Sequence, residues 1–223
     1  MCTRYYMDDS TSELTAIIEA VKKSPLYNNF IARSGKPVIT NGEVRPTDIA
    51  PVIAPSKKGI PTVYPMRWGF KNPDHDSTLF NARLETAGTK PTFKDAWNSH
   101  RCIIPANYYF EWKHYKDING NVKTGQKYAI QPSGATVTYL CGLYRIENDF
   151  PVFVILTKEP SEQIKALHDR MPLILPREKI DEWINPESLP ANLLKYAITD
   201  MVFEPVEETR GQIPNQMSIK YVT

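Results

Sequence analysis

The opening residues Met1-Cys2-Thr3-Arg4 contain the side chain with the most distinctive chemistry in this sequence. Removal of Met1 by an aminopeptidase, which generally requires a small second residue, would leave Cys2 with an α-amine and a thiol on adjacent carbons. Reference pKa values of about 8 for the amine and about 8.5 for the thiol leave both groups partly deprotonated at neutral pH. This 1,2-aminothiol can capture an aldehyde as an imine and then close to a thiazolidine. The alternative is that Cys2 belongs to an ordinary disordered terminus.

A second group of polar residues lies in the segment Phe80-Asn81-Ala82-Arg83-Leu84-Glu85-Thr86. In an extended backbone Asn81, Arg83 and Glu85 point to one face and apolar residues fill the other. The amide of Asn81 can orient a substrate, and the guanidinium of Arg83 can form a bidentate bond with phosphate. A solvated face is the alternative interpretation.

Glu111 lies among aromatic residues in Tyr108-Tyr109-Phe110-Glu111-Trp112. Burying a carboxylate among rings is costly unless it is paired or its pKa rises, and a raised pKa suits a general acid. Glu111 on an exposed edge strand is the alternative. Trp112 is typical either of a core or of a platform on which bases of single-stranded nucleic acid stack.

His168 lies at the predicted end of a helix, in Leu167-His168-Asp169-Arg170-Met171-Pro172. At the mouth of a site an imidazole can transfer protons near pH 7, although His168 on an apolar face also fits a core histidine. Arg170 can contact phosphate or pair with Asp169.

Composition limits the class of protein. The 223 residues are 41% hydrophobic and carry a formal charge of +2, which predicts one folded domain over residues 1–223 and no global field that attracts nucleic acid. The start of the chain lacks a signal-peptide pattern, and no run of 18 apolar residues occurs, so we expect an intracellular protein without membrane contact. We also expect a monomer. Cys2, Cys102 and Cys141 are widely spaced, which argues against disulfides and zinc. Cys102 and Cys141 fit small core residues, and neither a metal nor an organic cofactor is implied.

Four segments of the sequence show helical patterns. A capping box at Ser10-Thr11-Ser12-Glu13 predicts a helix with Leu14, Ile17, Ile18 and Val21 on its apolar face. Further helices are predicted after Ser161, after Pro176 and over Asn192 to Ala197. Ser24 to Asn41 is interpreted as a loop, and Lys90 to His100 as irregular chain with Phe93 and Trp97 as packing anchors.

Short β-rich runs dominate the rest of the chain. They are Pro51 to Ala54, Thr62 to Tyr64, Arg67 to Phe70, Leu79 to Thr86, Cys102 to Trp112, Lys127 to Ile130, Thr136 to Ile146, Phe150 to Leu156, Met171 to Leu175 and Met201 to Phe203. Prolines are interpreted as strand ends, and the three runs from Lys127 to Leu156 as an antiparallel meander. This pattern favours a single-domain α+β fold with a strongly bent antiparallel sheet or barrel and peripheral helices.

Five segments in this order resemble the SRAP family, the SOS response-associated peptidase or abasic-site processing proteins. They are Met1-Cys2-x-Arg4, Trp68-Gly69, Asn81-Ala82-Arg83-x-Glu85-Thr86, Phe110-Glu111-Trp112 and His168-Asp169-Arg170-Met171-Pro172. The resemblance covers most of the chain. It implies a distorted β-barrel and an enzyme of the DNA damage response that crosslinks itself to abasic sites in single-stranded DNA, with possible lyase, crosslink-reversal and autoproteolytic activity.

The resemblance also implies residue roles. Cys2 would form the thiazolidine with the ring-opened sugar, Asn81 would hold the terminus and the sugar, and Glu111 and His168 would transfer protons. The positions expected to contact DNA are Arg4, Trp68, Arg83, Trp112 and Arg170.

Two other classes of function remain open from the residues. One is an amino-terminal-nucleophile amidohydrolase in which Cys2 is acylated and its own amine acts as the base. The other is a non-enzymatic single-strand-binding module that uses the tryptophans and arginines, with Cys2 incidental.

Overall fold

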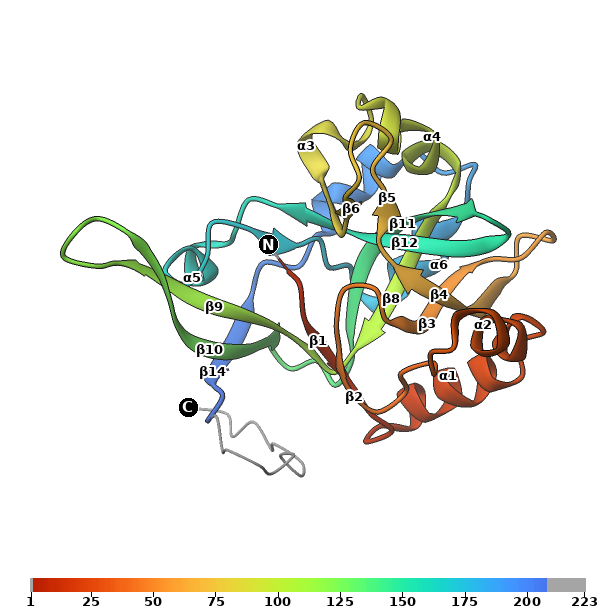
Figure 1. Ribbon diagram of the computed structural model, residues 1–223, viewed down its shortest axis with the longest axis horizontal. Coiled ribbons are helices and arrows are strands. Elements are labelled where there is room, and N and C mark those ends of the chain that lie inside the picture. The colour runs from red at the N-terminus through yellow and green to blue at the C-terminus, as the bar shows by residue number, and fades with distance from the viewer. Residues whose placement is uncertain (1, 208–223) are drawn as a thin grey trace.

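The computed structural model describes residues 2–207, which form two main sheets with helices at their edges (Figure 1). The smaller sheet has five antiparallel strands and includes strands from both ends of the described chain. In spatial order they are β14 (Met201–Pro205), β10 (Val122–Pro132), β9 (Tyr108–Lys116), β1 (Tyr5–Met7) and β2 (Gly42–Val44). Chain start and β9 are therefore neighbours.

The larger sheet closes on itself. Its path runs through β11 (Thr138–Glu147), β8 (Arg101–Ala106), β3 (Ile49–Pro55), β4 (Pro61–Trp68) and β12 (Phe150–Lys158), and β12 also pairs with β11. The two remaining strands, β13 (Met171–Pro172) and β7 (Asn81–Arg83), pair with β12. The predicted α+β fold with a bent barrel core is thus confirmed, although β12 runs parallel to β4 and β7.

Helices lie outside the barrel (Figure 1). They are α1 (Ser12–Lys22), α2 (Leu26–Ser34), α3 (Leu84–Ala87), α4 (Pro91–Ser99), α5 (Glu162–Lys165) and α6 (Ile180–Ile184), with 3-10 helices η1 (Arg177–Lys179) and η2 (Pro190–Tyr196). A small hairpin of β5 (Phe70–Lys71) and β6 (Thr78–Leu79) leads to β7. Among residues 2–207, no helix is both long enough and apolar enough to cross a membrane.

The first predicted helix is confirmed as α1. Its four predicted apolar residues are buried. The cap is shifted by one position, because the Thr11 side chain accepts a hydrogen bond from the Leu14 N–H at 3.1 Å. Glu13 instead forms an ion pair with Arg177 at 2.8 Å.

The prediction that two segments lack a helix is wrong. Ser24 to Asn41 contains α2, and Lys90 to His100 contains α4. Both helices begin beside a proline, and α2 ends at Gly35 in the left-handed conformation, which are the typical boundary residues of helices. The apolar periodicity of both segments is weak because each buries only one or two side chains.

The strand predictions need three corrections. Pro51 and Pro65 do not end strands but face each other inside β3 and β4, so neither is required to donate in the ladder. The expected meander is only partly present, because β10 pairs with β9 and β14 and not with β11. The predicted strands Leu79 to Thr86 and Cys102 to Trp112 are each interrupted, at the start of α3 and at Asn107.

Apolar side chains fill the space around the barrel sheet. Cys102 and Cys141 are completely buried and not in disulfides, as predicted for core residues. Trp68 is also completely buried, stacks on Phe153 with ring centroids 5.8 Å apart, and donates its indole N–H to the Phe80 carbonyl at 2.8 Å. The same network therefore fixes the residue that precedes Asn81.

Arg101 is a buried cation that sequence reasoning missed. Its guanidinium donates to the carbonyls of Trp97 (2.8 Å), Asn98 (2.7 Å) and Trp183 (2.7 Å), and also to Asn185 and Ser188. Burial lowers the pKa of Arg101 to about 10, so the side chain stays charged at neutral pH. Arg101 thereby stabilises the carboxyl ends of α4 and α6.

Candidate functional site

The site begins at Cys2, which is completely buried just before β1. The Phe110 N–H donates to the Arg4 carbonyl at 2.9 Å, continuing the β1–β9 ladder toward the start of the chain. The Cys2 thiol lies 3.8 Å from the Arg4 carbonyl. Since Glu111 follows Phe110 on β9, this pairing brings Cys2 and Glu111 to the same end of the ladder.

Glu111 and His168 form the acidic and basic parts of the site. Glu111 comes from β9 and His168 from the loop after α5, and the two side chains are nearly completely buried. Glu111 Oε2 lies 3.7 Å from His168 Nε2. Residues 57 positions apart in the chain are therefore brought together by the fold.

Burial determines the protonation of these groups. It raises the pKa of Glu111 to about 7, with a smaller contribution from the Asp169 carboxylate. Burial likewise raises the pKa of the Cys2 thiol, and the Glu111 carboxylate raises it further. Burial lowers the pKa of His168. At neutral pH the site thus favours a thiol, a neutral imidazole and a carboxyl group close to half-protonation.

The loop after His168 fixes its imidazole. The Arg170 N–H donates to His168 Nδ1 at 3.0 Å, which requires the tautomer with its proton on Nε2, toward Glu111. Asp169 Oδ1 lies 2.8 Å from the same Nδ1 and would become its acceptor when the ring is protonated. The first contact fits a ring whose Nδ1 is unprotonated and the second a ring whose Nδ1 carries a proton, so each contact is a hydrogen bond in one protonation state only.

The Arg170 side chain is mostly buried and is fixed by hydrogen bonds. Its guanidinium forms a bidentate ion pair with Glu85, both distances being 2.8 Å, and donates to the Thr157 carbonyl at 2.6 Å. The suggested pairing of Arg170 with Asp169 is therefore wrong. Arg170 links α3 and β12 to the loop that carries His168.

Two buried polar atoms beside β12 have no hydrogen-bond partner within residues 2–207: Asn81 Oδ1 and Thr157 Oγ1. Asn81 faces Ile155, and Thr157 faces Arg83, in the parallel β7–β12 pairing. Unpartnered buried acceptors are costly in a folded protein unless a ligand uses them. Thr157 was missed because a threonine within a β-rich run is an ordinary strand residue.

Arg4 belongs to a cluster of charges near the start of β1. Its Nε lies 2.9 Å from Glu43, which also contacts Lys127 (3.0 Å) and Arg45 (3.8 Å). Three cations thus share one carboxylate, which leaves excess positive charge near the start of the chain. Lys127 also lies over the Phe110 ring at 3.8 Å.

The other residues predicted to contact DNA differ in exposure. Arg83 is exposed at the start of α3, whereas Trp112 is half-buried and lies 5.3 Å from the Lys127 ammonium. Trp68 cannot stack on a base in this structure, because it is completely buried. That prediction is corrected: Trp68 supports the site from the core.

His114 is an additional residue that sequence reasoning missed. It is exposed on β9, and its ring centroid lies 5.2 Å from that of His168. The proximity results from the path of β9, which no local pattern indicates. Within the described part of the chain, no cluster of three or more His, Cys, Asp or Glu residues could hold a metal.

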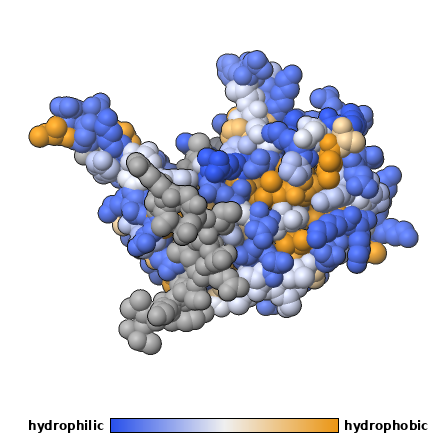
Figure 2. Space-filling view, turned by 60° about the horizontal axis from the view of Figure 1, so that its bottom comes forward, coloured by the Kyte–Doolittle hydropathy of each residue, from blue (hydrophilic) through white to orange (hydrophobic). Residues whose placement is uncertain are grey.

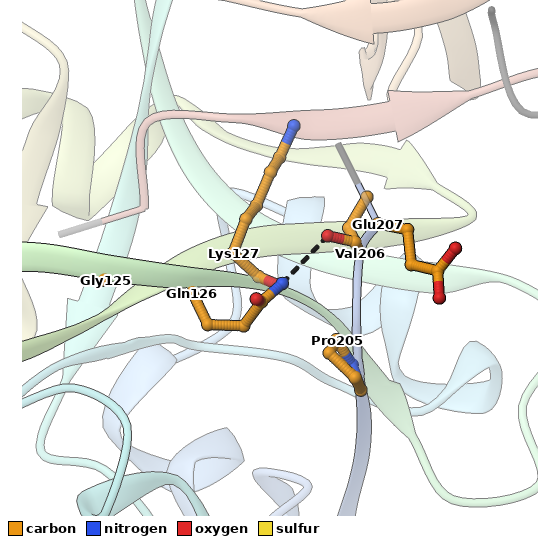
Figure 3. Close-up of a pocket in the computed structure, with 6 residues that line it drawn as sticks. All are labelled: Gly125, Gln126, Lys127, Pro205, Val206 and Glu207. Carbon is orange, nitrogen blue, oxygen red and sulfur yellow. Dashed lines mark hydrogen bonds between the residues drawn. The ribbon is translucent and has the colours of Figure 1, made fainter. Parts of the chain in front are cut away.

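A surface pocket lies apart from these residues, at the bulge of β10 and the end of β14 (Figure 3). The Gln126 side-chain amide donates across it to the Val206 carbonyl at 2.8 Å. Lys127 extends away from the pocket toward Glu43. None of the predicted site residues lines this pocket.

Fold and site together define an α+β barrel protein with a buried cysteine near the chain start and a buried glutamate–histidine pair whose glutamate lies on the strand that pairs with that start. Residues 1–212 match the family described as SOS response associated peptidase (SRAP), and the chain belongs to this family. The resemblance of the five sequence segments is thereby confirmed.

Relatives with curated names support this assignment. The abasic site processing protein YoaM of Bacillus subtilis is 34% identical over 151 residues, which are 61% of this chain and 64% of the relative. The abasic site processing protein YedK of Escherichia coli is 28% identical over 163 residues, 68% of this chain and 71% of that protein. The match to YoaM thus spans less than two thirds of its length.

Solved structures support the fold alone. A protein from Bacteroides thetaiotaomicron has a TM-score of 0.69 at 22% identity, with 93% of both chains covered. A phage-related protein from Bordetella bronchiseptica has a TM-score of 0.64 at 20% identity, with 93% of this chain and 95% of that chain covered.

Proposed function

We propose that this protein captures abasic sites in single-stranded DNA by forming a covalent crosslink through Cys2 once Met1 is removed. The main support is the pairing of the chain start with β9, which brings the Cys2 segment and Glu111 to the same end of one ladder. The names of the relatives, abasic site processing proteins, favour the same substrate. We further propose that the chain acts as a single intracellular domain and as a monomer.

The crosslink forms in two steps. The neutral α-amine of Cys2 attacks C1′ of the ring-opened sugar, the carbonyl oxygen takes up a proton, and loss of water gives an imine. The sulfur of Cys2 then adds to the imine carbon, the thiol proton is transferred to nitrogen, and the five-membered thiazolidine closes. The overall change is condensation with loss of one water molecule.

Glu111 and His168 supply the proton transfers in this proposal. A carboxyl group with a pKa of about 7 can protonate the departing oxygen and then accept a proton from the thiol. His168, neutral and oriented by the Arg170 N–H, acts as the second acid and base near the sugar. The unpartnered Asn81 amide oxygen is available to the Cys2 amine or to the sugar.

Arg4 and Arg83 are the proposed phosphate contacts, and Trp112 is the proposed stacking surface. Arg83 is exposed and Arg4 belongs to a cluster with excess positive charge, which supports contact with phosphates. The two terminal nitrogens of Arg170 already donate to Glu85 and the Thr157 carbonyl, so its proposed contribution to DNA binding is smaller. Lyase activity, crosslink reversal and self-cleavage are further proposed uses of the same cysteine.

The test combines mass spectrometry with a denaturing gel. The mature protein should lack Met1, and incubation with a single-stranded oligonucleotide bearing a glycosylase-generated abasic site should give a heat-stable adduct. Cys2→Ser should bind the oligonucleotide but form no heat-stable adduct, because an alcohol is a much weaker nucleophile than a thiol. An unchanged adduct yield in Cys2→Ser contradicts the mechanism.

The same experiment separates the alternatives. An amidohydrolase would lack Met1 and yet form no adduct with abasic DNA. A simple binding module would bind the oligonucleotide equally well with Met1 retained and with Cys2 replaced.

A further inference from the structure

The strands β9 and β10 extend beyond the body of the protein as a two-stranded arm, formed by residues 113–123 (Figure 1). Its strands pair through Val122 with Lys116, Lys123 with Tyr115 and Thr124 with His114. A turn at Asp117–Gly120 closes the end, where the Gly120 N–H donates to the Asp117 carbonyl at 2.9 Å. The arm is thus regular β-structure and not an irregular loop.

The end of the arm exposes apolar surface. Ile118 is 100% exposed, Val122 65% and Tyr115 54%. These are three of the eight large apolar side chains exposed among residues 2–207, although the arm has only eleven residues. Figure 2 shows hydrophobic surface at the far end of this projection. Such clustering at a protruding end favours a contact surface over scattered surface residues.

The arm is also basic. Residues 113–123 contain three lysines, one histidine and a single acidic residue, Asp117, so three positive charges against one negative give a net charge of +2 without the histidine. The cores of protein–protein interfaces are depleted in lysine, whereas lysines alternating with an exposed aromatic ring are typical of surfaces that bind single-stranded nucleic acid. Nucleic acid is therefore the occupant that the composition favours.

The arm is continuous with the proposed active site. Glu111 lies on β9 just before the arm, and His114 at its base lies next to His168. From Glu111 to the end of β9 at Lys116 the strand extends about 17 Å, at roughly 3.3 Å per residue. A DNA strand that leaves the site in this direction would remain beside the arm for several nucleotides.

We propose that the arm binds the single-stranded DNA that flanks the captured nucleotide. Tyr115 stacks on a base, Lys113 and Lys123 contact phosphates, and Ile118 and Val122 cover unstacked bases at the far end. This inference rests on the proposed function, because it places the damaged nucleotide at Cys2. It adds a binding surface that lengthens the footprint on one side of the lesion.

Noncovalent binding of tetrahydrofuran oligonucleotides tests the arm separately from the chemistry, because this abasic analogue has no aldehyde to crosslink. One oligonucleotide carries three nucleotides on each side of the analogue, and two others extend either the 5′ or the 3′ flank to ten. We expect one longer flank to tighten binding to the wild-type protein at least about fivefold, the effect of one stacked base. No gain from either flank overturns the proposal.

The variant Tyr115→Ala/Ile118→Asn should lose this gain while binding the short oligonucleotide as the wild type does. The control Ile146→Asn changes an exposed isoleucine, 62% exposed, on the separate β11–β12 hairpin and should keep the gain. A double variant that keeps the full gain, or a control that loses it equally, overturns the proposal.

Salt dependence gives a second readout. Lys123→Ala should reduce the slope of log affinity against log salt by about 0.7 for the long oligonucleotide only, as expected for one lost phosphate contact to a single strand. Lys58→Ala, at an exposed lysine in the turn between β3 and β4, is the control. If the wild-type protein binds through the arm but forms no adduct with real abasic DNA, the proposed chemistry fails and the arm inference stands. If adducts form normally but the arm variants bind the long oligonucleotide as the wild type does, the arm inference fails and the proposed chemistry stands.

Discussion

Glu111 Oε2 and His168 Nε2 lie 3.7 Å apart, and both side chains are buried. This separation is longer than a hydrogen bond, so a small movement or an inserted substrate oxygen can connect the two groups. Burial acts on them in opposite directions, raising the pKa of the acid and lowering that of the base. The pKa of Glu111, at about 7, thereby lies above the lowered pKa of His168, so near neutral pH a partly protonated carboxyl group and a neutral imidazole can serve as acid and base during condensation.

The first prediction concerns Glu111→Gln, which should slow crosslinking and also stabilise the fold at alkaline pH. Burial raises the pKa of the Glu111 carboxyl from 4.5 in the unfolded chain to about 7 in the folded protein, so the protonated group favours the folded state. This contribution to the free energy of unfolding is fully present below the unfolded pKa and is lost as the pH rises through 7. Glutamine removes that pH dependence. Relative to wild type, the variant should gain about 2–3 kcal/mol in unfolding free energy between pH 5 and pH 8.

Urea denaturation at the two pH values measures this gain, and single-turnover crosslinking measures the rate. The control Glu162→Gln replaces a carboxyl that is 91% exposed in its side chain, so its stability should show no such change. A difference between Glu111→Gln and wild type that is equal at pH 5 and pH 8 contradicts the buried-acid interpretation.

The second prediction concerns Arg83→Ala, which should weaken noncovalent DNA binding and reduce its salt slope by about 0.7 through loss of one phosphate contact. Crosslinking at saturating DNA should change little, since Arg83 is exposed outside the buried Cys2–Glu111–His168 group. Fluorescence anisotropy over a series of salt concentrations measures the slope. Arg67→Ala is the control, because Arg67 is similarly exposed and pairs with Glu147 at 3.4 Å. Equal effects of the two variants would remove Arg83 from the binding surface.

The third prediction concerns Arg170, whose bidentate contact with Glu85 supports the His168 loop. Both Arg170→Lys and Glu85→Gln should slow crosslinking severalfold and cost about 1–3 kcal/mol of stability, since each weakens a charged hydrogen-bonded pair. Neither should lower the salt slope of DNA binding. A lower slope in Arg170→Lys with unchanged stability would instead assign Arg170 to a phosphate.

The fold class and the candidate site residues were predicted from two different kinds of sequence feature. Local patterns predicted α1 and most β-runs because apolar spacing and caps depend on neighbouring residues. Cys2 and Glu111 were predicted as site residues because a cysteine after Met1 and an acid among rings are unusual wherever they occur, and the fold brings Glu111 within 3.7 Å of His168. The α2 and α4 helices were missed because their few buried residues give little periodicity.

Other features depend on contacts that no local pattern specifies. The burial of Trp68 follows from its stacking on Phe153, 85 residues later in the chain. The Glu85–Arg170 ion pair also joins residues 85 apart, and it displaced the nearer Asp169 as partner. Closure of the barrel through β11 and β12 likewise determines which polar atoms, such as Asn81 Oδ1, lie without a partner in the described structure.

The last prediction concerns Arg101, the first residue of β8, where an arginine would ordinarily be exposed. Its guanidinium instead donates to carbonyls at the ends of α4 and α6, about 80 residues apart in sequence. Lysine keeps the charge but has three donors and no planar fork, so Arg101→Lys would leave several buried carbonyls without partners.

We therefore expect Arg101→Lys to cost about 3–5 kcal/mol of unfolding free energy, the range found when one member of a buried charged network is lost. Arg177→Lys is the matched control, because Arg177 forms one exposed ion pair with Glu13 and should cost less than about 1 kcal/mol. Chemical denaturation of both variants gives the comparison. Since the residues that accept hydrogen bonds from Arg101 are not among the proposed site residues, any Arg101→Lys protein that remains folded at low temperature should crosslink at the wild-type rate. Equal losses of stability in the two variants would mean that the buried carbonyls find other donors.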